Sequence, residues 1–551
     1  MFMKSIHTYS RMLLLAVVAG ALSILTSFNT YAQEKGQFNP SKDSIAFFHE
    51  FRGVWLTTVR GSDWPRNIKI NYERLEGESK RRMEKRIERQ RDSQKVALVD
   101  LMKKIKSTGS NAVMVQMVCN SESYYCSKIL PWDYNLTGTQ GVDPGYDPLK
   151  LAVETGHKLG MEVHAWLNPM RIGSVENERV ADHPCKVHPE FVQTYNKTMY
   201  WDPSNPEVVD YLYRLVTEIV TNYNVDGIHI DDYFYPDGLR GDEKDTMWKD
   251  GHNYAKYLKA HKAEVEKKME AWKSKLCGTM TAEDSLMIQK DTTALTLDLW
   301  REVNVNNVVR AMHTATHKAN PNAVFGVSPG GRLVNTQRLY ADPQHWIAEG
   351  TIDYLIPQIY WQHGHKVADY KLVLDSWKDI MKDVPMFVGM GAYRYKSTGF
   401  ETMDEFMKQM EEAREADYVY GNVWFTAHSL FKDDFLPYMQ KNIYPYESLA
   451  PKLGTSTYPA PAAPELKVSG EKLHWESVAD ADGYAVYELS PKSGVKTKCG
   501  GAVWEANMVK RILVGDQKHD TKFAAEKGKT YVVLATRGKE KSEPSNVVRT
   551  K

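Results

Sequence analysis

Residues 225–236 read VDGIHIDDYFYP, a short apolar run that ends abruptly in two acids, three aromatic residues and a proline. The residues before it have the spacing of one helix face, with apolar side chains at 208, 211, 212, 215, 216, 219, 220 and 223. Asn205-Pro206 predicts where this helix starts. A helix leading into a buried strand that ends in acids is typical of α/β barrels and open α/β sheets, whose active sites lie at the carboxyl ends of parallel strands.

The two acids, Asp231 and Asp232, cannot both point inward from a regular strand, because successive strand residues face opposite sides. One is expected to face the barrel axis, and the other to turn into the loop or to pair locally. In the alternative interpretation, both acids cap the next turn. The flanking aromatic residues favour a sugar-binding site over a turn.

The same alternation of helix and strand recurs along residues 50–445. Strands are predicted at 51–59, 112–118, 161–167, the opening stretch, 323–327, 352–360, 386–390 and 422–426. Helices are predicted at 95–107, 147–160, 205–223, 301–319, 340–349, 367–382 and 402–415. Eight such units predict an α/β fold, a (β/α)8 TIM-type barrel. The charged residues 238–299 interrupt the pattern and predict an insertion after the fourth strand.

A change of composition marks the end of the barrel. Residues 446–464 include TYPAPAAP and predict an extended Pro/Ala linker, with few contacts across the boundary. Residues 465–551 alternate as strands do, and their Leu-x-Trp, Gly-Tyr-x-Val-Tyr and Tyr-x-Val motifs resemble a fibronectin type III domain, a small all-β immunoglobulin-like sandwich. Trp475 and Tyr531 are expected to lie in its core.

Composition and the N-terminus bear on location and partners. The chain has 71 basic and 70 acidic residues, so its net charge favours neither nucleic acid nor an anionic membrane. Residues 1–32 have a charged start, a short apolar run and a small-x-small site before Gln33. This pattern predicts a signal peptide and export to the periplasm or beyond; an uncleaved membrane anchor is the alternative. No later segment is apolar enough to span a bilayer.

The five cysteines form neither a metal-binding spacing nor a disulfide framework. Cys119 and Cys126 are close enough in sequence to allow a bridge, but free core thiols are the simpler interpretation. No Gly-rich phosphate loop is present, so neither a cofactor nor a metal is predicted.

The barrel resembles the glycosyl-hydrolase-like family 10 from about residue 50 to residue 440. The matching motifs are RGVW at 52–55, YY at 124–125, PW at 131–132, LTG at 136–138, EVHAWLNP at 162–169, DGIHIDDYFYP at 226–236, FGVSP at 325–329 and IDYLIPQIYW at 352–361. The resemblance implies a (β/α)8 glycosidase and, for some relatives, activity on peptidoglycan glycan strands stripped of peptides. After strand two, many relatives carry arginines and an aspartate where this chain has Cys119-Asn120-Ser121-Glu122.

Glycoside hydrolysis generally needs two carboxyl groups astride the scissile bond. Asp231 is the first candidate for the ionised carboxylate and Asp232 the second, and the run ending at Asp231 also resembles strand four of α-amylase-type barrels, where the final Asp is the nucleophile. The candidates for the acid are Glu122, Asp342 and Asp63, each with an alternative role as a capping or surface acid. Asp353 starts a strand, hence the wrong barrel end, and is expected to be structural.

The remaining strand exits supply candidate groups for reading a sugar. Polar candidates that follow strands, or lie in one, are Asp63, Asn168, Arg171, His229, Gln358, Arg394 and His428, and aromatic candidates are Trp64, Tyr233, Tyr360, Trp361, Tyr393 and Trp424. His229 is equally compatible with a satisfied core histidine. Arginine pairs with carboxylates in bidentate fashion, so Arg171 and Arg394 suit a carboxylated sugar such as muramic acid.

The sequence therefore predicts an exported glycosidase acting on a bacterial polysaccharide. Two alternatives belong to other classes: a non-catalytic glycan-binding protein with a degenerate barrel, and an adhesion or scaffold protein whose C-terminal domain binds another protein. Release of reducing ends separates the first alternative from an enzyme, and sugar affinity separates the second.

Overall fold

The computed structural model describes residues 38–231, 234–239, 248–275, 293–381, 384–498, 501–515 and 521–551. The chain forms two compact units. The larger contains Phe48–Glu488 and Asn507–Lys551, and the smaller contains the residues up to Phe47 together with Leu489–Ala506.

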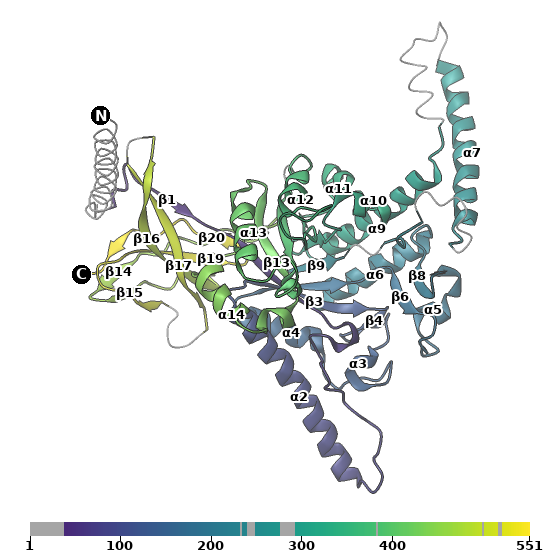
Figure 1. Cartoon of the computed structure of the whole chain (residues 1–551), viewed down its shortest axis with the longest axis horizontal. Coiled ribbons are helices and arrows are strands. Elements are labelled where there is room, and N and C mark those ends of the chain that lie inside the picture. Colours follow the sequence, from purple (N-terminus) through teal and green to yellow (C-terminus); the bar gives the residue numbers. More distant parts are fainter. Residues whose placement is uncertain are drawn as a thin grey trace, which may run out of the picture. The chain divides into compact units, whose positions relative to one another are not determined.

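A closed barrel of parallel strands dominates the larger unit (Figure 1). The strands pair in the order β2, β3, β5, β9, β10, β11, β12, β13, and β13 pairs back to β2. The (β/α)8 prediction is therefore confirmed. The strands are β2 Phe51–Leu56, β3 Ala112–Cys119, β5 Glu162–Leu167, β9 Gly227–Ile230, β10 Val324–Val327, β11 Tyr354–Leu355, β12 Met386–Met390 and β13 Val419–Phe425.

Helices lie outside the strands (Figure 1), and several of them begin at a capping side chain. The Asn205 side chain accepts a hydrogen bond from the Glu207 amide and starts α6 with Pro206 at its first turn. The helix then buries the predicted stripe, including Leu212, Val216 and Ile219. The principal barrel helices are α2 Lys80–Ser107, α4 Pro148–Lys158, α6 Pro206–Asn222, α9 Leu297–Ala319, α11 Pro343–Glu349, α12 Tyr370–Ser376 and α13 Asp404–Glu415.

The sixth strand is much shorter than predicted. The sequence predicts a strand at 352–360, but β11 covers only Tyr354–Leu355. Pro357 has no amide hydrogen to donate, and its carbonyl accepts from both Ile359 and Gly389. Beyond this irregular turn, Gln358 returns to the sheet through single bridges to Gly330 and Gly389.

Smaller elements fill the connections between the barrel units. An antiparallel sheet of β6, β8 and β7 lies between β5 and α6, and α7 belongs to the predicted insertion, of which 240–247 and 276–292 lie outside the described residues. These elements are β4 Glu122–Ser123, β6 Arg171–Ser174, β7 Val192–Tyr195, β8 Thr198–Trp201, η1 Val59–Gly61, α3 Tyr134–Thr137, α5 Pro184–Val187, η2 Pro189–Phe191, α7 Gly251–Lys275, α10 Leu333–Arg338, η3 Ala392–Arg394, η4 Ala427–Phe431, α14 Phe435–Tyr438 and η5 Met439–Ile443.

The inside of the barrel is a packed core. We call it the interior cluster; its buried members are Phe51, Trp55, Ala112, Met114, Trp166, Val324, Tyr354, Ile356, Phe387, Val423 and Leu453. Two histidines, His164 and His229, are fully buried among these residues. The Tyr354 hydroxyl lies 2.9 Å from Nδ1 of His164 and 3.3 Å from Nδ1 of His229. The cluster occupies the space below the carboxyl ends of the strands.

Tyr354→Phe is expected to destabilise the barrel by about 1–3 kcal/mol, because it leaves polar groups of two buried histidines without this hydroxyl partner. Urea denaturation at pH 7 measures the change in the free energy of unfolding. Tyr420→Phe is the matched control, since Tyr420 is 46% exposed and the same change should alter stability by under about 0.5 kcal/mol. Equal stability of the two variants would contradict this description of the core.

The C-terminal part of the chain is all-β, as predicted. Its strands are β14 Lys467–Ser469, β15 Lys472–His474, β16 Gly483–Lys496, β17 Ala502–Leu513, β18 Lys522–Ala524, β19 Thr530–Arg537, β20 Glu540–Lys541 and β21 Val548–Arg549. Within the larger unit, β14, β15 and β18 form one sheet, while β19 pairs with β20 and β21. Trp475 and Tyr531 lie in the core as expected, with exposures of 3% and 1%. The fibronectin type III assignment stays a prediction.

The stretch predicted to be a linker makes more contacts than expected. Leu449 and Leu453 are buried, and Leu453 belongs to the interior cluster. The Lys539 and Lys541 ammonium groups donate to the carbonyls of Leu453 and Ala450, at 2.9 and 3.1 Å. The expectation of few contacts across this boundary is wrong, because apolar side chains anchor the first half of the stretch.

In the smaller unit, strand β1 (Ser44–Phe47) pairs in parallel with Val503–Ala506 of β17. Asp43 accepts hydrogen bonds from the Ala502 amide at 2.7 Å and the Trp504 ring nitrogen at 3.1 Å. Across the described part of the chain, no helix has both the length and the apolar character needed to cross a bilayer.

Three cysteines lie among the described residues, and all are free. Cys119 and Cys185 are buried, as expected of core thiols, whereas Cys126 is exposed. The bridge between Cys119 and Cys126 is therefore not formed. Cys277 and Cys499 lie outside the described residues.

Candidate active site

Strand β9 directs Asp231 toward the barrel axis. His229, two residues earlier, contacts Trp55, Trp166 and Tyr354 of the interior cluster. Because strand side chains alternate with a period of two, Asp231 continues on the same inward side at the carboxyl end of the strand. Its side chain is only 4% exposed. Asp232 and Tyr233 lie outside the described residues, so their candidate roles stay predictions.

A chain of hydrogen bonds that joins the ends of four neighbouring strands, β2, β3, β5 and β9, holds the Asp231 carboxylate. The Asn168 amide nitrogen donates to Oδ2 of Asp231. The Asn168 carbonyl oxygen accepts from Nε2 of Gln116 at 2.7 Å, and Gln116 itself accepts from the Thr58 and Val59 amides at 2.8 and 2.9 Å. Each bond orients the next amide, so the donor that faces Asp231 is set in advance. Asn168, a candidate sugar ligand from the strand-three exit, thus holds Asp231 in place.

His229 is a core residue and no sugar ligand. It is fully buried, its Nε2 accepts from the Trp55 ring nitrogen at 3.0 Å, and its Nδ1 faces the Tyr354 hydroxyl. Burial holds the pKa of His229 well below its usual range, so the ring is neutral. The suggested sugar contact is wrong, and the alternative of a satisfied core histidine is correct.

Glu122 has the properties of a proton donor. It lies just beyond β3, in a tight hairpin whose turn residues Asn120 and Ser121 have left-handed φ angles of 53° and 59°. Burial, and then repulsion from Asp133, raise the pKa of Glu122 to about 7. Burial likewise raises the pKa of Asp133 to about 6. A carboxyl group with a pKa near neutrality can protonate a leaving group at physiological pH.

The charges of both candidate carboxylates, Glu122 and Asp231, affect the pKa of the Cys119 thiol. The Cys119 thiol is buried at the end of β3, and burial raises its pKa well above the usual value. The charges of Asp133, Glu122 and Asp231 raise this pKa further, while that of Arg171 lowers it. Glu122 pairs with Cys119 at the end of β3, Arg171 follows β5 and Asp231 follows β9, so all three belong to the carboxyl end of the barrel.

All three candidate acids accept backbone hydrogen bonds. Glu122 accepts from the Tyr134 amide at 2.8 Å. Asp342 is the N-cap of α11 and accepts from the His345 amide at 3.1 Å. Asp63 accepts from Thr57 with one oxygen, and from the Thr426 hydroxyl and the His428 amide with the other. Asp342 thus has the capping role that the sequence offered as its alternative. Asp63 joins the exit of β2 to the exit of β13 and no longer suits the acid role.

An aromatic wall follows β11, β12 and β13. The rings of Tyr360 and Tyr393 meet edge to face at 5.8 Å, and Phe425 lies 6.0 Å from Tyr360 and 6.1 Å from Tyr393. Tyr393 is 48% exposed and can offer its face to a ligand. Trp361 is half-buried, with its ring near His365 and its side chain against the core between strands and helices.

Two tryptophans predicted to stack on sugar are buried instead. Trp64 is 1% exposed, and its ring nitrogen donates to the Gln94 carbonyl of α2 at 3.0 Å. Trp424 is fully buried on the outer side of β13, and its ring nitrogen donates to the Tyr444 hydroxyl at 3.0 Å. Both predictions are wrong, because these rings fill the layer between strands and helices.

The polar candidates divide between two sides of the rim. Arg171 starts β6, opposite Tyr200 of β8. Arg394 lies over the Phe400 ring, 5.5 Å from its centroid, and Gln358 donates to the Ser328 carbonyl at 3.3 Å. The His428 ring lies within 2.9 Å of the Arg66 guanidinium. The structure therefore leaves Arg171, Arg394 and His428 as half-buried rim residues.

Four residues of this end were not predicted: Gln116, Asp133, Phe425 and Arg66. Gln116 had a signal, since it is the single polar residue in the apolar run of β3. The other three had none, because each lies in a loop or at a strand end whose neighbours only folding determines.

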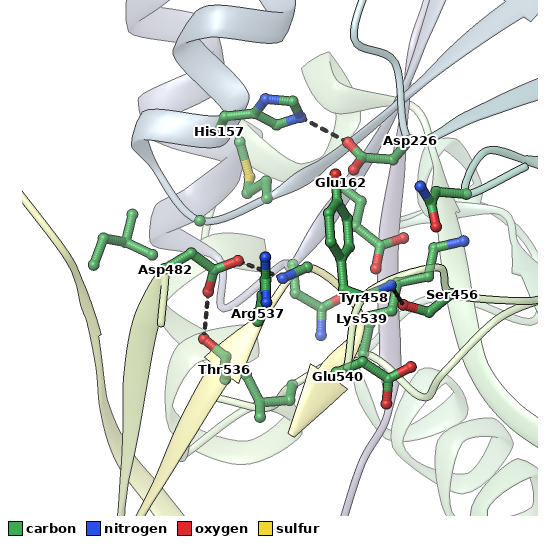
Figure 2. A pocket seen from close by; sticks show the side chains of 18 of the residues that line it. His157, Glu162, Asp226, Ser456, Tyr458, Asp482, Thr536, Arg537, Lys539 and Glu540 are labelled. Atoms are coloured by element: carbon green, nitrogen blue, oxygen red, sulfur yellow. Dashed lines mark hydrogen bonds and ion pairs between the residues drawn. The ribbon is translucent and has the colours of Figure 1, made fainter. Parts of the chain in front are cut away.

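A pocket of about 860 Å³ lies at the opposite end of the barrel, among residues that begin strands (Figure 2). Its wall includes Glu162, the first residue of β5, and Asp226. Oδ2 of Asp226 lies 2.9 Å from Nε2 of His157. Residues of the C-terminal part of the chain, among them Thr536 of β19 and Lys539 in the turn before β20, complete the wall. Asp231 and Glu122 are not among its residues, so this pocket is separate from the candidate active site.

The chain belongs to the family described as Glycosyl hydrolase-like 10, whose model matches residues 50–408. The match spans the barrel from β2 into α13 and includes every carboxylate considered above. The class defined by fold and family is thus that of glycosidase-type (β/α)8 barrels.

Curated relatives carry names of the same kind. Glycosyl hydrolase YngK of Bacillus subtilis is 30% identical over 450 residues, which cover 77% of this chain and 78% of the relative. Glycosyl hydrolase DigH of Escherichia coli K12 is 27% identical over 421 residues, covering 70% and 83%. Among solved structures, an Anoxybacillus α-amylase matches with 10% identity and a TM-score of 0.38, over 89% of this chain and all of that one.

Proposed function

We propose that the protein is an exported glycoside hydrolase that cleaves peptidoglycan glycan strands stripped of their peptides. The observation that supports catalysis best is the position of Asp231: it faces the barrel axis at the carboxyl end of β9 and is held there by Asn168. Membership of the Glycosyl hydrolase-like 10 family and the names of the relatives support a hydrolase.

Asp231 serves as the ionised carboxylate, facing the positive charge that develops at the anomeric carbon. The Asn168 amide nitrogen donates to Oδ2 of Asp231 and so fixes the orientation of this carboxylate. Glu122 serves as the acid that protonates the leaving oxygen. Burial and the nearby Asp133 raise the pKa of Glu122 to about 7, so this carboxyl group is mostly protonated below about pH 7 and can act as the acid there.

The rim residues suit a glycan with acidic groups. Tyr360 and Tyr393 offer stacking faces, and Arg171 and Arg394 supply guanidinium groups on two sides of the rim. Arginine binds a carboxylate such as the muramic acid lactyl group through paired hydrogen bonds. The family resemblance, which includes relatives active on such strands, favours the same substrate class.

The N-terminal pattern of residues 1–32 supports export, and export would bring the enzyme to the compartment that contains peptidoglycan. The mature protein should begin at Gln33, after cleavage following Ala32. N-terminal sequencing of the protein from its natural host measures this directly. Recovery of an intact Met1 in the membrane fraction would contradict cleavage and favour an anchor.

The substrate is tested by incubating the full chain with peptide-free glycan strands and, separately, with intact peptidoglycan. We expect new reducing ends and shorter oligosaccharides from the peptide-free strands, and much less from the intact polymer. Strand binding without reducing-end release would instead identify a glycan-binding protein with an inactive barrel. Absence of both binding and release would exclude glycan strands as the ligand.

A further inference from the structure

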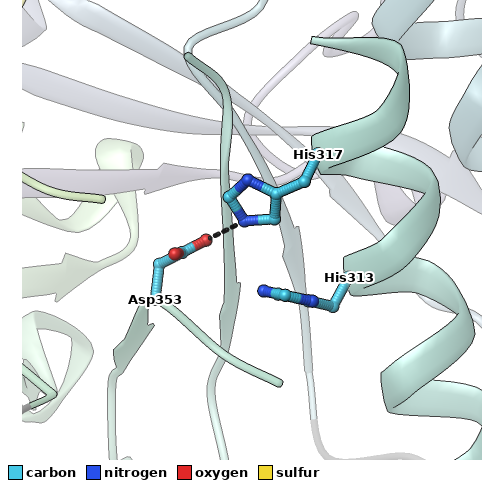
Figure 3. A group of neighbouring side chains, drawn as sticks. All are labelled: His313, His317 and Asp353. Carbon is cyan, nitrogen blue, oxygen red and sulfur yellow. Dashed lines mark hydrogen bonds and ion pairs between the residues drawn. The ribbon is translucent and has the colours of Figure 1, made fainter. Parts of the chain in front are cut away.

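Three side chains at the end of the barrel opposite to Asp231 form a cluster of metal-ligating type (Figure 3). His313 and His317 belong to α9, and Asp353 immediately precedes β11. One potential ligand atom from each residue lies within 4.8 Å of the others. All three residues are half-buried, so the cluster is open to solvent and to an entering ion.

The helix determines the approach of the two imidazoles. Residues four apart in an α-helix lie on the same face, one turn above the other. The ring centroids of His313 and His317 are 4.4 Å apart, with an angle of 54° between the ring planes. Figure 3 shows both rings extending from α9 on the side where Asp353 lies.

Asp353 is held in place independently of the histidines. Its Oδ2 accepts the Phe325 amide hydrogen of β10 at 2.6 Å and also contacts Nε2 of His317 at 2.8 Å. The Asp353 amide in turn donates to the Phe325 carbonyl. Asp353 therefore has the structural position expected of a residue at the start of a strand, and its second oxygen remains available within this cluster.

We propose that His313, His317 and Asp353 bind one divalent transition-metal ion, with zinc as the best match. Two imidazole nitrogens and one carboxylate oxygen are a donor set that suits Zn²⁺, Ni²⁺ or Cu²⁺ and suits Mg²⁺ and Ca²⁺ poorly. Atoms bound to the same zinc lie roughly 3 to 4 Å apart, given zinc–ligand lengths of about 2 Å. Small rotamer changes of the histidines bring the three atoms into that range.

Such an ion would join the C-terminal part of α9 to the start of β11. It would lie at the amino ends of the strands, whereas Asp231 and Glu122 lie at the carboxyl ends. The ion would accordingly stabilise the barrel without entering the hydrolytic reaction. The sequence predicted no metal, because the helical His313-x-x-x-His317 pair finds its third ligand only in the folded chain.

The test uses the untagged full chain, stripped with a chelator and then titrated with ZnCl₂. Calorimetry and metal analysis should give one tight zinc per chain, with a higher melting temperature in zinc than in the stripped protein. His313→Ala is the more informative variant, because the hydrogen bond to Asp353 comes from His317 at 2.8 Å and is kept when the His313 ring is removed. We expect His313→Ala to lose about tenfold or more in zinc affinity while its melting temperature without metal stays unchanged.

His345→Ala is the matched control. His345 lies on α11 and pairs with Glu349 one turn away, so it is another partly exposed helical histidine near a carboxylate. Zinc binding should be unchanged in this variant, and MgCl₂ or CaCl₂ should not replace zinc in the wild type. Absence of zinc binding at micromolar concentration, or equal binding by the wild type and His313→Ala, would overturn the proposal.

Discussion

Asp231→Asn is expected to lower the rate of glycan hydrolysis at least about a hundredfold while leaving the fold intact. The substitution keeps the shape of the side chain but removes the negative charge that faces the developing oxocarbenium ion. Loss of such preorganised stabilisation typically costs about 3 kcal/mol or more. The measurement is the initial rate of reducing-end release at pH 6, with glycan binding measured in parallel.

Binding should survive in this variant, because the rim residues Arg171, Tyr360 and Tyr393 are unchanged. Asp232→Asn is the control: the alternation along β9 directs Asp231 to the axis, so the neighbouring position should face elsewhere. We expect Asp232→Asn to keep most of the activity. Hydrolysis at the wild-type rate by Asp231→Asn would transfer the catalytic assignment to Asp232.

Glu122→Gln is expected to reduce the rate by about 10²- to 10⁴-fold at pH 6, the usual contribution of a general acid. It should also change the shape of the pH profile. In the wild type the acid must be protonated, so kcat/KM should fall as pH rises above about 7, where the Glu122 carboxyl loses its proton. Glutamine does not titrate, and the remaining activity of the variant should lack this alkaline decline.

Asp133→Asn separates catalysis by Glu122 from a structural role. The Asp133 charge is one cause of the raised pKa of Glu122, so its removal should shift the alkaline decline to lower pH. Asparagine can still accept hydrogen bonds from the Tyr124 hydroxyl and the Asn135 amide at the same oxygen, so the start of α3 should be preserved. An unchanged alkaline decline in both variants would show that another group donates the proton.

Local sequence signals were sufficient for the barrel. Apolar spacing and caps predicted α6 and its neighbours, and the strands were found within a few residues except at β11. There, Pro357 interrupts the ladder, and the amino-acid pattern alone reads as one continuous strand. The expectation of a linker with few contacts was wrong for a different reason, since Leu453 belongs to the interior cluster, whose members come from several strands of the barrel.

The candidate site was predictable in part. The end of a buried strand indicated Asp231 as the first candidate, and the period of two predicted that only one of Asp231 and Asp232 faces the barrel axis. The same reasoning could not distinguish a ring at the rim from a ring in the layer below, which is why Trp64 and Trp424 were misplaced. How far along the barrel axis a side chain lies, and which side of its strand it occupies, depend on strand register and on packing against the helices.

The sequence by itself thus determined the barrel and the strand whose acidic end carries Asp231, because helix and strand periodicity and capping are properties of neighbouring residues. Only the tertiary structure decided the environment of each group. It joined Gln116, Asn168 and Asp231 into one hydrogen-bonded chain, buried His229 and brought Asp133 near Glu122. Protonation and hydrogen bonding depend on distance and desolvation, and these arise between residues that are far apart in the chain.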